Sequence, residues 1–170
     1  MHFLEQVALK RLNALVRLST LLVFAVMVLA VMGQVVFRYV LRISVPWSEE
    51  LARFLFIWAT FLGASIAFCE GGHINVSFFV GRIRNIRAQA LVRLTAYAFC
   101  LWFLGMYVWD GFILCNRLIA MGQTSPAIPR LLMGVVYLAI PIGSLLMICN
   151  ILPHVARCLL AVHTGKQDGG

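Results

Sequence analysis

Charge is scarce in this chain, and negative charge is the scarcest. Charged residues make up 12% of its 170 residues, with 6 Asp and Glu against 14 Lys and Arg, while 62% of the residues are hydrophobic. A soluble domain of this size cannot bury that much apolar surface. The composition therefore excludes a soluble domain and predicts a protein whose solvent is lipid.

The chain also lacks the residue groupings that catalysis and metal binding need. Its 5 cysteines form no CxxC motif and no Cys/His cluster, so neither a disulfide framework nor a zinc site is expected. The 4 histidines lie at or beyond the ends of the apolar stretches, where they are badly placed to hold a haem between spans. There is no nucleophile–base pair and no phosphate-binding loop. We predict no enzyme activity, no catalytic residue, no cofactor and no metal.

Four apolar stretches have the length that crosses a bilayer. A hydrocarbon core about 30 Å thick takes roughly 20 helical residues at about 1.5 Å each. The predicted spans cover about 18–38, 49–69, 91–114 and 131–152. The predicted fold is an all-α membrane protein with four transmembrane helices, in which residues 18–152 form the membrane domain.

Two segments outside these spans have amphipathic patterns. Residues 1–17 predict a helix that is either an interfacial helix on the inner leaflet or a charged overhang of the first span. Residues 74–90 carry apolar residues at steps of three or four, which indicates an inner-leaflet segment. Its basic residues predict contact with phospholipid headgroups through Arg82, Arg84 and Arg87. Residues 153–170 are predicted to form a cytoplasmic tail.

The net charge of +8 fits membrane orientation better than nucleic-acid binding. Nine basic residues fall on one side of the predicted spans: Lys10, Arg11, Arg17, Arg82, Arg84, Arg87, Arg93, Arg157 and Lys166. The other side has five: Arg38, Arg42, Arg53, Arg117 and Arg130. Since basic residues favour the cytoplasm, both termini are predicted to be cytoplasmic, with outer loops at 38–50 and 115–130.

The beginning of the second span gathers charge of both signs. Ser48 is a predicted N-cap, and the carboxylates of Glu49 and Glu50 suit the positive end of the helix dipole. Glu49 and Arg53 also have the favourable i, i+4 spacing. Such near-surface charges indicate either an ion or substrate path or a set of paired interface charges, and their number favours pairing. The expected pairs join Glu49 or Glu50 with Arg38 or Arg53, and Asp110 with Arg117 or Arg38.

Within the spans, small and polar residues predict helix packing. Ala59, Gly63 and Ala67 recur at four-residue intervals and favour a helix–helix face over a coincidence of composition. Pro141 and Gly143 predict a kink in the fourth span. A carrier needs a polar site near the middle of the bilayer, commonly built from broken helices. The few central polar residues, Gln34, Thr60 and Ser65, are better explained by hydrogen bonds between helices.

Four short motifs follow one another between residues 37 and 76. They are Phe37-Arg38-Tyr39, Trp47-Ser48-Glu49-Glu50-Leu51-Ala52-Arg53, Phe61-Leu62-Gly63-Ala64 and Gly72-His73-Ile74-Asn75-Val76. In order and spacing they resemble the small membrane subunit, DctQ type, of tripartite ATP-independent periplasmic (TRAP) transporters. The length, the four spans and the predicted cytoplasmic termini extend the resemblance to the whole chain.

The resemblance implies a multi-pass subunit in the bacterial inner membrane with two protein partners. One is a large multi-span permease that carries the sodium and substrate sites, and the other is a periplasmic substrate-binding protein. It implies ion-gradient-driven uptake of organic anions, with this chain as a non-catalytic scaffold. The residues assigned to subunit architecture are Arg38, Trp47, Glu49, Glu50, Arg53, Ala59, Gly63, Ala67, His73 and Asp110.

The predicted outer loops are the surface that a periplasmic partner would meet. The residues assigned to that surface are Arg42, Ser44, Gln123, Ser125 and Arg130. The competing hypothesis is an independent four-span protein, such as a small exporter or the membrane anchor of a redox complex. An exporter would act when expressed alone, and a redox anchor would absorb visible light when purified.

Overall fold

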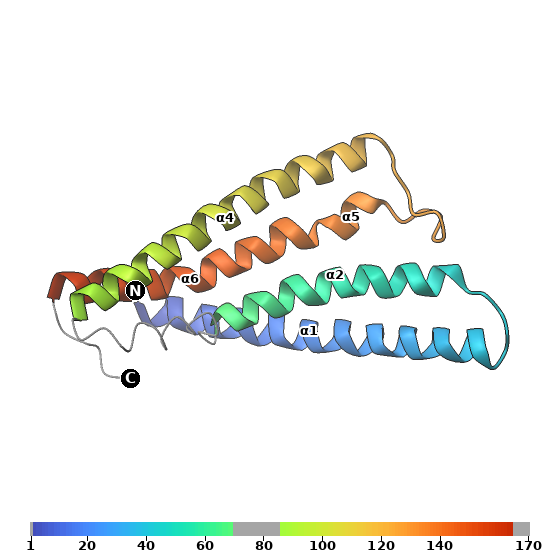
Figure 1. The fold of residues 1–170 in the computed structure, drawn as a ribbon, viewed down its shortest axis with the longest axis horizontal. Helices are drawn as coiled ribbons and strands as arrows, with labels where there is room; N and C mark the ends of the chain where they lie inside the picture. Colours follow the sequence, from blue (N-terminus) through green and yellow to red (C-terminus); the bar gives the residue numbers. More distant parts are fainter. Residues whose placement is uncertain (1, 70–85, 165–170) are drawn as a thin grey trace.

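The computed structural model describes residues 2–69 and 86–164, which form helices joined by short connections (Figure 1). The helices are α1 (His2–Tyr39), α2 (Pro46–Cys69), α4 (Ile86–Ala120), α5 (Met133–Tyr137) and α6 (Ala139–Thr164). Four stretches are long and apolar enough to cross a membrane: Arg11–Tyr39, Pro46–Cys69, Leu91–Ala120 and Met133–Leu159. The prediction of an all-α protein with four spans is confirmed.

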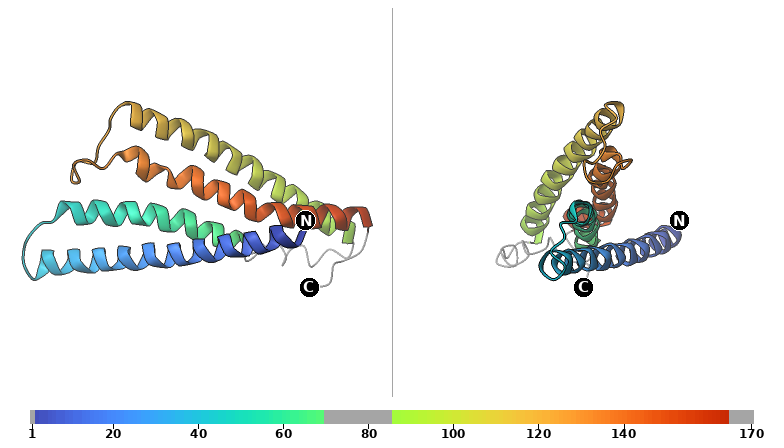
Figure 2. Two further views of the ribbon diagram at one scale, coloured as in Figure 1. Left: turned by 180° about the vertical axis from the view of Figure 1, so that it is seen from behind. Right: turned by 90° about the vertical axis from the view of Figure 1, so that its right-hand side faces the viewer.

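The long helices lie in a row, in the order α4, α6, α2, α1 (Figure 1). Each helix packs against its neighbours in the row. Among the described helices, only the backbone of α2 comes close to that of α1. The end-on view in Figure 2 shows that the two edge helices, α1 and α4, are strongly inclined to each other. The end with the α1–α2 turn and the α4–α5 loop is named the outer end, following the predicted orientation, and the opposite end is the inner end.

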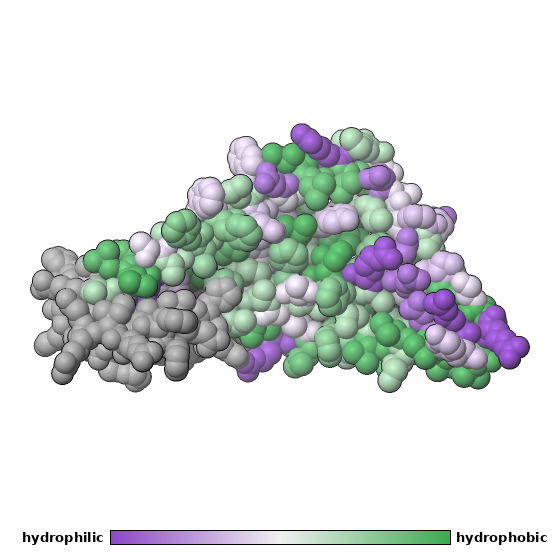
Figure 3. Space-filling view, in the orientation of Figure 1, coloured by the Kyte–Doolittle hydropathy of each residue, from purple (hydrophilic) through white to green (hydrophobic). Residues whose placement is uncertain are grey.

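The core of this row is small and lies where α2, α4 and α6 meet. Phe68, Leu104, Met147 and Ile151 form a buried cluster, and partly buried side chains such as Phe61 pack around it. Most other large apolar side chains are exposed, including many on α1. Figure 3 shows apolar surface over much of the molecule, with many of the hydrophilic residues on this face gathered toward the outer end. Lipid or a protein partner must cover the apolar surface.

Two helices extend beyond the predicted spans. Residues 2–17 are continuous with the first span in the single helix α1, so no break separates the predicted N-terminal segment from that span. α6 continues past the predicted end of the fourth span at Leu152 and reaches Thr164, with Pro153 inside the helix. The predicted segment 74–90 lies mostly outside the described residues, which resume at Ile86 with the first turn of α4.

The fourth span is interrupted at Leu138, between α5 and α6. Pro141 explains the position of this break, since proline has no N–H to donate to the carbonyl of Tyr137 four residues earlier. Neighbouring bonds bridge the gap: the Leu138 N–H donates to the Gly134 carbonyl, and the Ile142 N–H donates to the Leu138 carbonyl, both at 3.1 Å. The kink was predicted, but it falls one turn before Pro141.

The glycine at which α2 and α6 come closest lies on α6, not on the predicted face of α2. A Cβ atom placed on Gly143 would stand 2.6 Å from the Cβ of Phe61 on α2. A Cβ on Gly63 would meet the Thr20 methyl group of α1 at an ordinary 3.9 Å. Ala59 is half-buried and Ala67 is exposed. Gly143 is therefore the residue that lets α2 and α6 approach each other.

We predict that Gly143→Ala lowers the free energy of unfolding by about 1–3 kcal/mol, because overpacking forces the two helices apart. Gly63→Ala is the matched control and should leave stability unchanged or slightly higher, since alanine favours a helix more than glycine does. Both are measured by unfolding the purified chain in mixed micelles. Equal stability of the two variants would contradict the close approach at Gly143.

Candidate assembly site at the outer end

The carboxylate of Glu50 joins the beginning of α2 to the loop between α4 and α5. Its Oε2 accepts a hydrogen bond from the Ser125 hydroxyl and a second one from the Ala127 N–H at 3.2 Å. The Ser125 hydroxyl oxygen in turn accepts a bond from the Ile128 N–H at 3.1 Å. Glu50 therefore accepts hydrogen bonds from a loop residue 75 positions away in sequence.

The same loop is closed on itself by backbone hydrogen bonds. α4 ends in a Schellman-type turn: Gly122 has a φ of 60°, and the Gln123 N–H donates to the Leu118 carbonyl. The Ser125 N–H then donates to the Leu131 carbonyl, and the Met133 N–H donates to the Gln123 carbonyl at 2.9 Å. The loop is thus an ordered platform that Glu50 fixes to the outer end of α2.

The predicted charge pairs formed only in part. Arg53 and Glu49 pair at 3.4 Å on the surface of α2, as their spacing predicted. Glu50 binds the loop instead of an arginine. Asp110 pairs with neither Arg117 nor Arg38 in the described part of the chain. The exposed Glu49–Arg53 pair is worth less than about 1 kcal/mol, so the Glu50 contacts matter more for stability.

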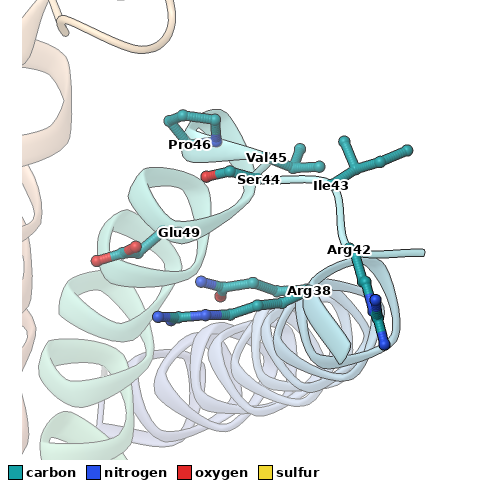
Figure 4. A pocket seen from close by; sticks show the side chains of 8 residues that line it. Arg38, Arg42, Ile43, Ser44, Val45, Pro46 and Glu49 are labelled. Atoms are coloured by element: carbon teal, nitrogen blue, oxygen red, sulfur yellow. The ribbon is translucent and has the colours of Figure 1, made fainter. Parts of the chain in front are cut away.

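A hollow lies between the end of α1 and the beginning of α2, lined by Gln34, Arg38, Ser44, Pro46 and Glu49, among others. Figure 4 shows Arg38 extending toward α2 while Arg42 points away from it. Arg42 has a φ of 54°, a left-handed conformation that non-glycine residues adopt at a cost. Arg38 therefore lines the α1–α2 junction, whereas Arg42 is exposed on the turn.

The prediction that Ser48 caps α2 was wrong. The helix begins at Pro46, whose fixed φ and missing N–H suit the first helical position. Ser48 lies inside the helix, is buried, and donates its hydroxyl to the Ala30 carbonyl of α1 at 3.2 Å. It therefore bonds α2 to α1 in place of capping its own helix.

A second group of polar side chains, at the inner end, was missed in the sequence. The Asn13 amide of α1 donates to the Asn150 Oδ1 of α6 and to the Cys69 Sγ of α2, each at 3.0 Å. The Asn150 amide donates to the Ser65 carbonyl of α2 at 3.0 Å. These bonds, the Asn13 network, link three helices. Asn150, an asparagine inside the fourth apolar stretch, is the signal that would have pointed to this network.

The other predicted residues are spread over the molecule. Trp47 is exposed beside a groove that is also lined by Pro126 and Ala127 of the loop. Of the residues assigned to the periplasmic partner surface, Arg42, Ser44, Gln123 and Arg130 are exposed, whereas Ser125 is buried. His73, Arg82 and Arg84 lie outside the described residues, and Arg87 falls in the first turn of α4.

The arrangement of polar groups defines a class of protein. Within residues 2–69 and 86–164, no three His, Cys, Asp or Glu side chains gather as metal ligands would. Hydrogen bonds between residues far apart in sequence join helices to one another or a helix to the outer loop. The chain is a multi-pass membrane protein whose polar residues hold its helices in position. Residues 27–161 match the model of the DctQ component of tripartite ATP-independent periplasmic transporters, and the chain belongs to that family.

Curated relatives agree with this family. The chain is 35% identical over 72 residues to a TRAP transporter small permease protein of Haemophilus influenzae, covering 42% of this chain and 45% of that protein. It is 30% identical over 83 residues to the sialic acid TRAP transporter small permease protein SiaQ of Vibrio cholerae, covering 49% and 48%. It is 29% identical over 110 residues to the isethionate TRAP transporter permease protein DctMQ of Oleidesulfovibrio alaskensis, covering 65% and 17%. The alignments thus span less than half the length of each relative.

Proposed function

We propose that this chain is the small, non-catalytic permease subunit of an ion-gradient-driven, sodium-coupled transporter in the bacterial inner membrane. It packs against a large multi-span permease that carries the transport site. The proposal rests on one observation, which is how the polar side chains inside the spans are buried and hydrogen-bonded. Ser65 and Ser144 are fully buried and Asn150 nearly so, and the amide of Asn150 is already bonded to another helix. Within the described helices these three polar side chains are enclosed between helices, whereas a carrier presents its polar groups to a substrate site near mid-depth.

The proposed substrate class is an organic anion. Sialic acid and isethionate, which appear in the names of two relatives, carry a carboxylate and a sulfonate respectively. The relative named DctMQ is much longer than its aligned segment, which supports a partnership between a DctQ-like segment and a larger permease. Substrate choice would then be a property of the partners.

The proposed docking surface for a periplasmic substrate-binding protein is the outer end. Arg42 and Arg130 are exposed there, each held in a left-handed backbone conformation on the turn and on the loop. Gln123 and Ser44 are exposed nearby in sequence on the same two segments. Two exposed cations favour a partner with an acidic face. Arg82, Arg84 and Arg87 are proposed, from the sequence, to contact phospholipid headgroups.

Uptake measurements test the proposed function. Cells that express the permease and the binding protein with and without this chain are compared for accumulation of labelled organic anions. We expect accumulation to require the chain and to vanish when the sodium gradient is collapsed by an ionophore. Liposomes that hold this chain alone should accumulate nothing. Uptake that is unchanged without the chain, or uptake by the chain alone, would contradict the assignment as a non-transporting subunit.

A further inference from the structure

One side of α4 carries a regular series of exposed residues. Successive residues of the series are alternately four and three positions apart. This spacing keeps them on one face of the helix, as in a helix–helix seam. They are Phe99, Phe103, Met106, Asp110, Ile113 and Arg117, named here the α4 seam, and all are exposed. Leu104 and Cys115 are buried on the other side of the helix, toward α6 and α5. Since α4 is an edge of the row, no described helix covers the seam.

Asp110 is the residue of the seam that is least compatible with a lipid environment, because its side chain is a carboxylate. Asp110 lies in the outer half of the candidate span Leu91–Ala120, roughly 7 Å from its midpoint and about 15 Å from its outer end. A hydrocarbon core centred on that midpoint, with a half-thickness of about 15 Å, includes Asp110. Its carboxylate forms no hydrogen bond or ion pair with another described residue. An aspartate side chain is too short to reach the headgroups as Lys and Arg do. A charge at this depth therefore needs a partner that the described residues do not supply.

The aromatic residues beside Asp110 also indicate that a protein covers this face of α4. Trp102 lies on the flank of the seam near the middle of the span and is 66% exposed. Tryptophan exposed to lipid gathers at the membrane surface rather than at mid-depth, and tryptophan is enriched in protein interfaces. Phe103 and Tyr107 pack ring against ring with centroids 4.6 Å apart, which holds this part of the surface in a fixed shape. The shape of this surface therefore suits a protein partner better than lipid chains.

We propose that the α4 seam is the surface on which the large permease subunit packs, through a membrane helix that carries an Arg or Lys opposite Asp110. This inference rests on the proposed function, because it takes the permease as the partner. A basic side chain satisfies the carboxylate within the span, and the aromatic side chains separate the pair from lipid.

The two other occupants fit less well. Lipid chains offer no hydrogen-bond donor to Asp110. A second copy of this chain has the same orientation in the membrane, so a two-fold contact along the seam would bring one Asp110 carboxylate against the other. Arg117 is seven residues away, about 10 Å along the axis, and does not relieve that repulsion.

The test compares Asp110→Leu with the unaltered chain, each tagged and purified in mild detergent from membranes that contain the permease. We expect the amount of permease recovered with Asp110→Leu to fall at least tenfold, while the variant chain itself stays folded and melts at the same or a higher temperature. A lipid-facing seam predicts the opposite result, since leucine suits lipid better than aspartate does. Unchanged recovery of permease with Asp110→Leu would overturn the proposal.

Two further arms make the result decisive. Asn116→Leu is the matched control, because Asn116 is an exposed polar residue of α4 off the seam, and its recovery of permease should be unchanged. If Asp110→Leu aggregates, a photo-reactive phenylalanine at Phe103 in the otherwise unaltered chain gives the answer: a cross-link to the permease supports the seam, and cross-links to lipid alone overturn it. Failure of the unaltered chain to recover any permease would instead refute the proposed function and the seam with it.

Discussion

Replacing Glu50 with Ala is expected to free the α4–α5 loop from α2 and to lower the free energy of unfolding by about 2–4 kcal/mol. The estimate follows from hydrogen bonds to a charged group, each worth about 1.5–3 kcal/mol, of which Glu50 accepts two. The Ala127 N–H would lose its partner, and the Ser125 hydroxyl would keep only the bond that it accepts from Ile128. The outer end of α2 would then lose its link to the loop.

A double-mutant cycle separates this link from other effects of the substitution. Glu50→Ala, Ser125→Ala and the double variant are unfolded in mixed micelles, and the coupling energy is expected to be about 1–2 kcal/mol. Glu49→Ala is the matched control, since Glu49 is a neighbouring acid whose exposed pair with Arg53 contributes less than about 1 kcal/mol. Additive effects of Glu50→Ala and Ser125→Ala would show that the two side chains act independently, against the structure.

Replacing Asn150 with Leu is expected to lower the free energy of unfolding by about 1–3 kcal/mol and to release the inner end of α1. Asn150 is 6% exposed and uses both ends of its amide, one toward Asn13 and one toward Ser65. Hydrogen bonds between membrane helices average about 0.6 kcal/mol and reach about 1.7. The effect is larger than a single bond because the substitution removes two hydrogen bonds, one to α1 and one to α2.

The coupling between Asn13→Ala and Asn150→Leu gives the strength of that contact. We expect a coupling energy of about 0.5–1.5 kcal/mol from a cycle measured in mixed micelles. Asn116→Leu, the same substitution at an exposed position of α4, should change stability by less than about 0.5 kcal/mol. A coupling energy of zero would mean that α1 is held by α2 alone.

Local patterns in the sequence predicted the local features of this structure. The four apolar runs gave the spans, because a bilayer fixes how many apolar residues a helix needs. The i, i+4 spacing of Glu49 and Arg53 gave their ion pair, because one turn of one helix decides it.

Contacts between distant segments were not predictable in the same way. Glu50 was expected to pair with an arginine, yet it binds Ser125, since the folded loop brings donors closer than any guanidinium. Ser48 was expected to cap its helix, but Pro46 already begins α2 and places Ser48 against α1. Such outcomes depend on how helices are placed side by side, which periodicity does not specify.

The packing of small residues shows the same limit. Gly63 and its neighbours have the spacing of a helix–helix face, but spacing does not say how near the next helix comes. From the sequence, Gly143 was assigned only to a predicted kink, and the placement of Phe61 against it reveals the close approach of α2 and α6.

The central claim is that this chain works as a scaffold for a separate permease. The most direct measurement is to purify the tagged chain from its native membrane in mild detergent and to identify by mass spectrometry what is recovered with it. The account predicts a large multi-span permease in about equal amount. Recovery of this chain alone, folded and monodisperse, would contradict the account and would return attention to an activity within its own four spans.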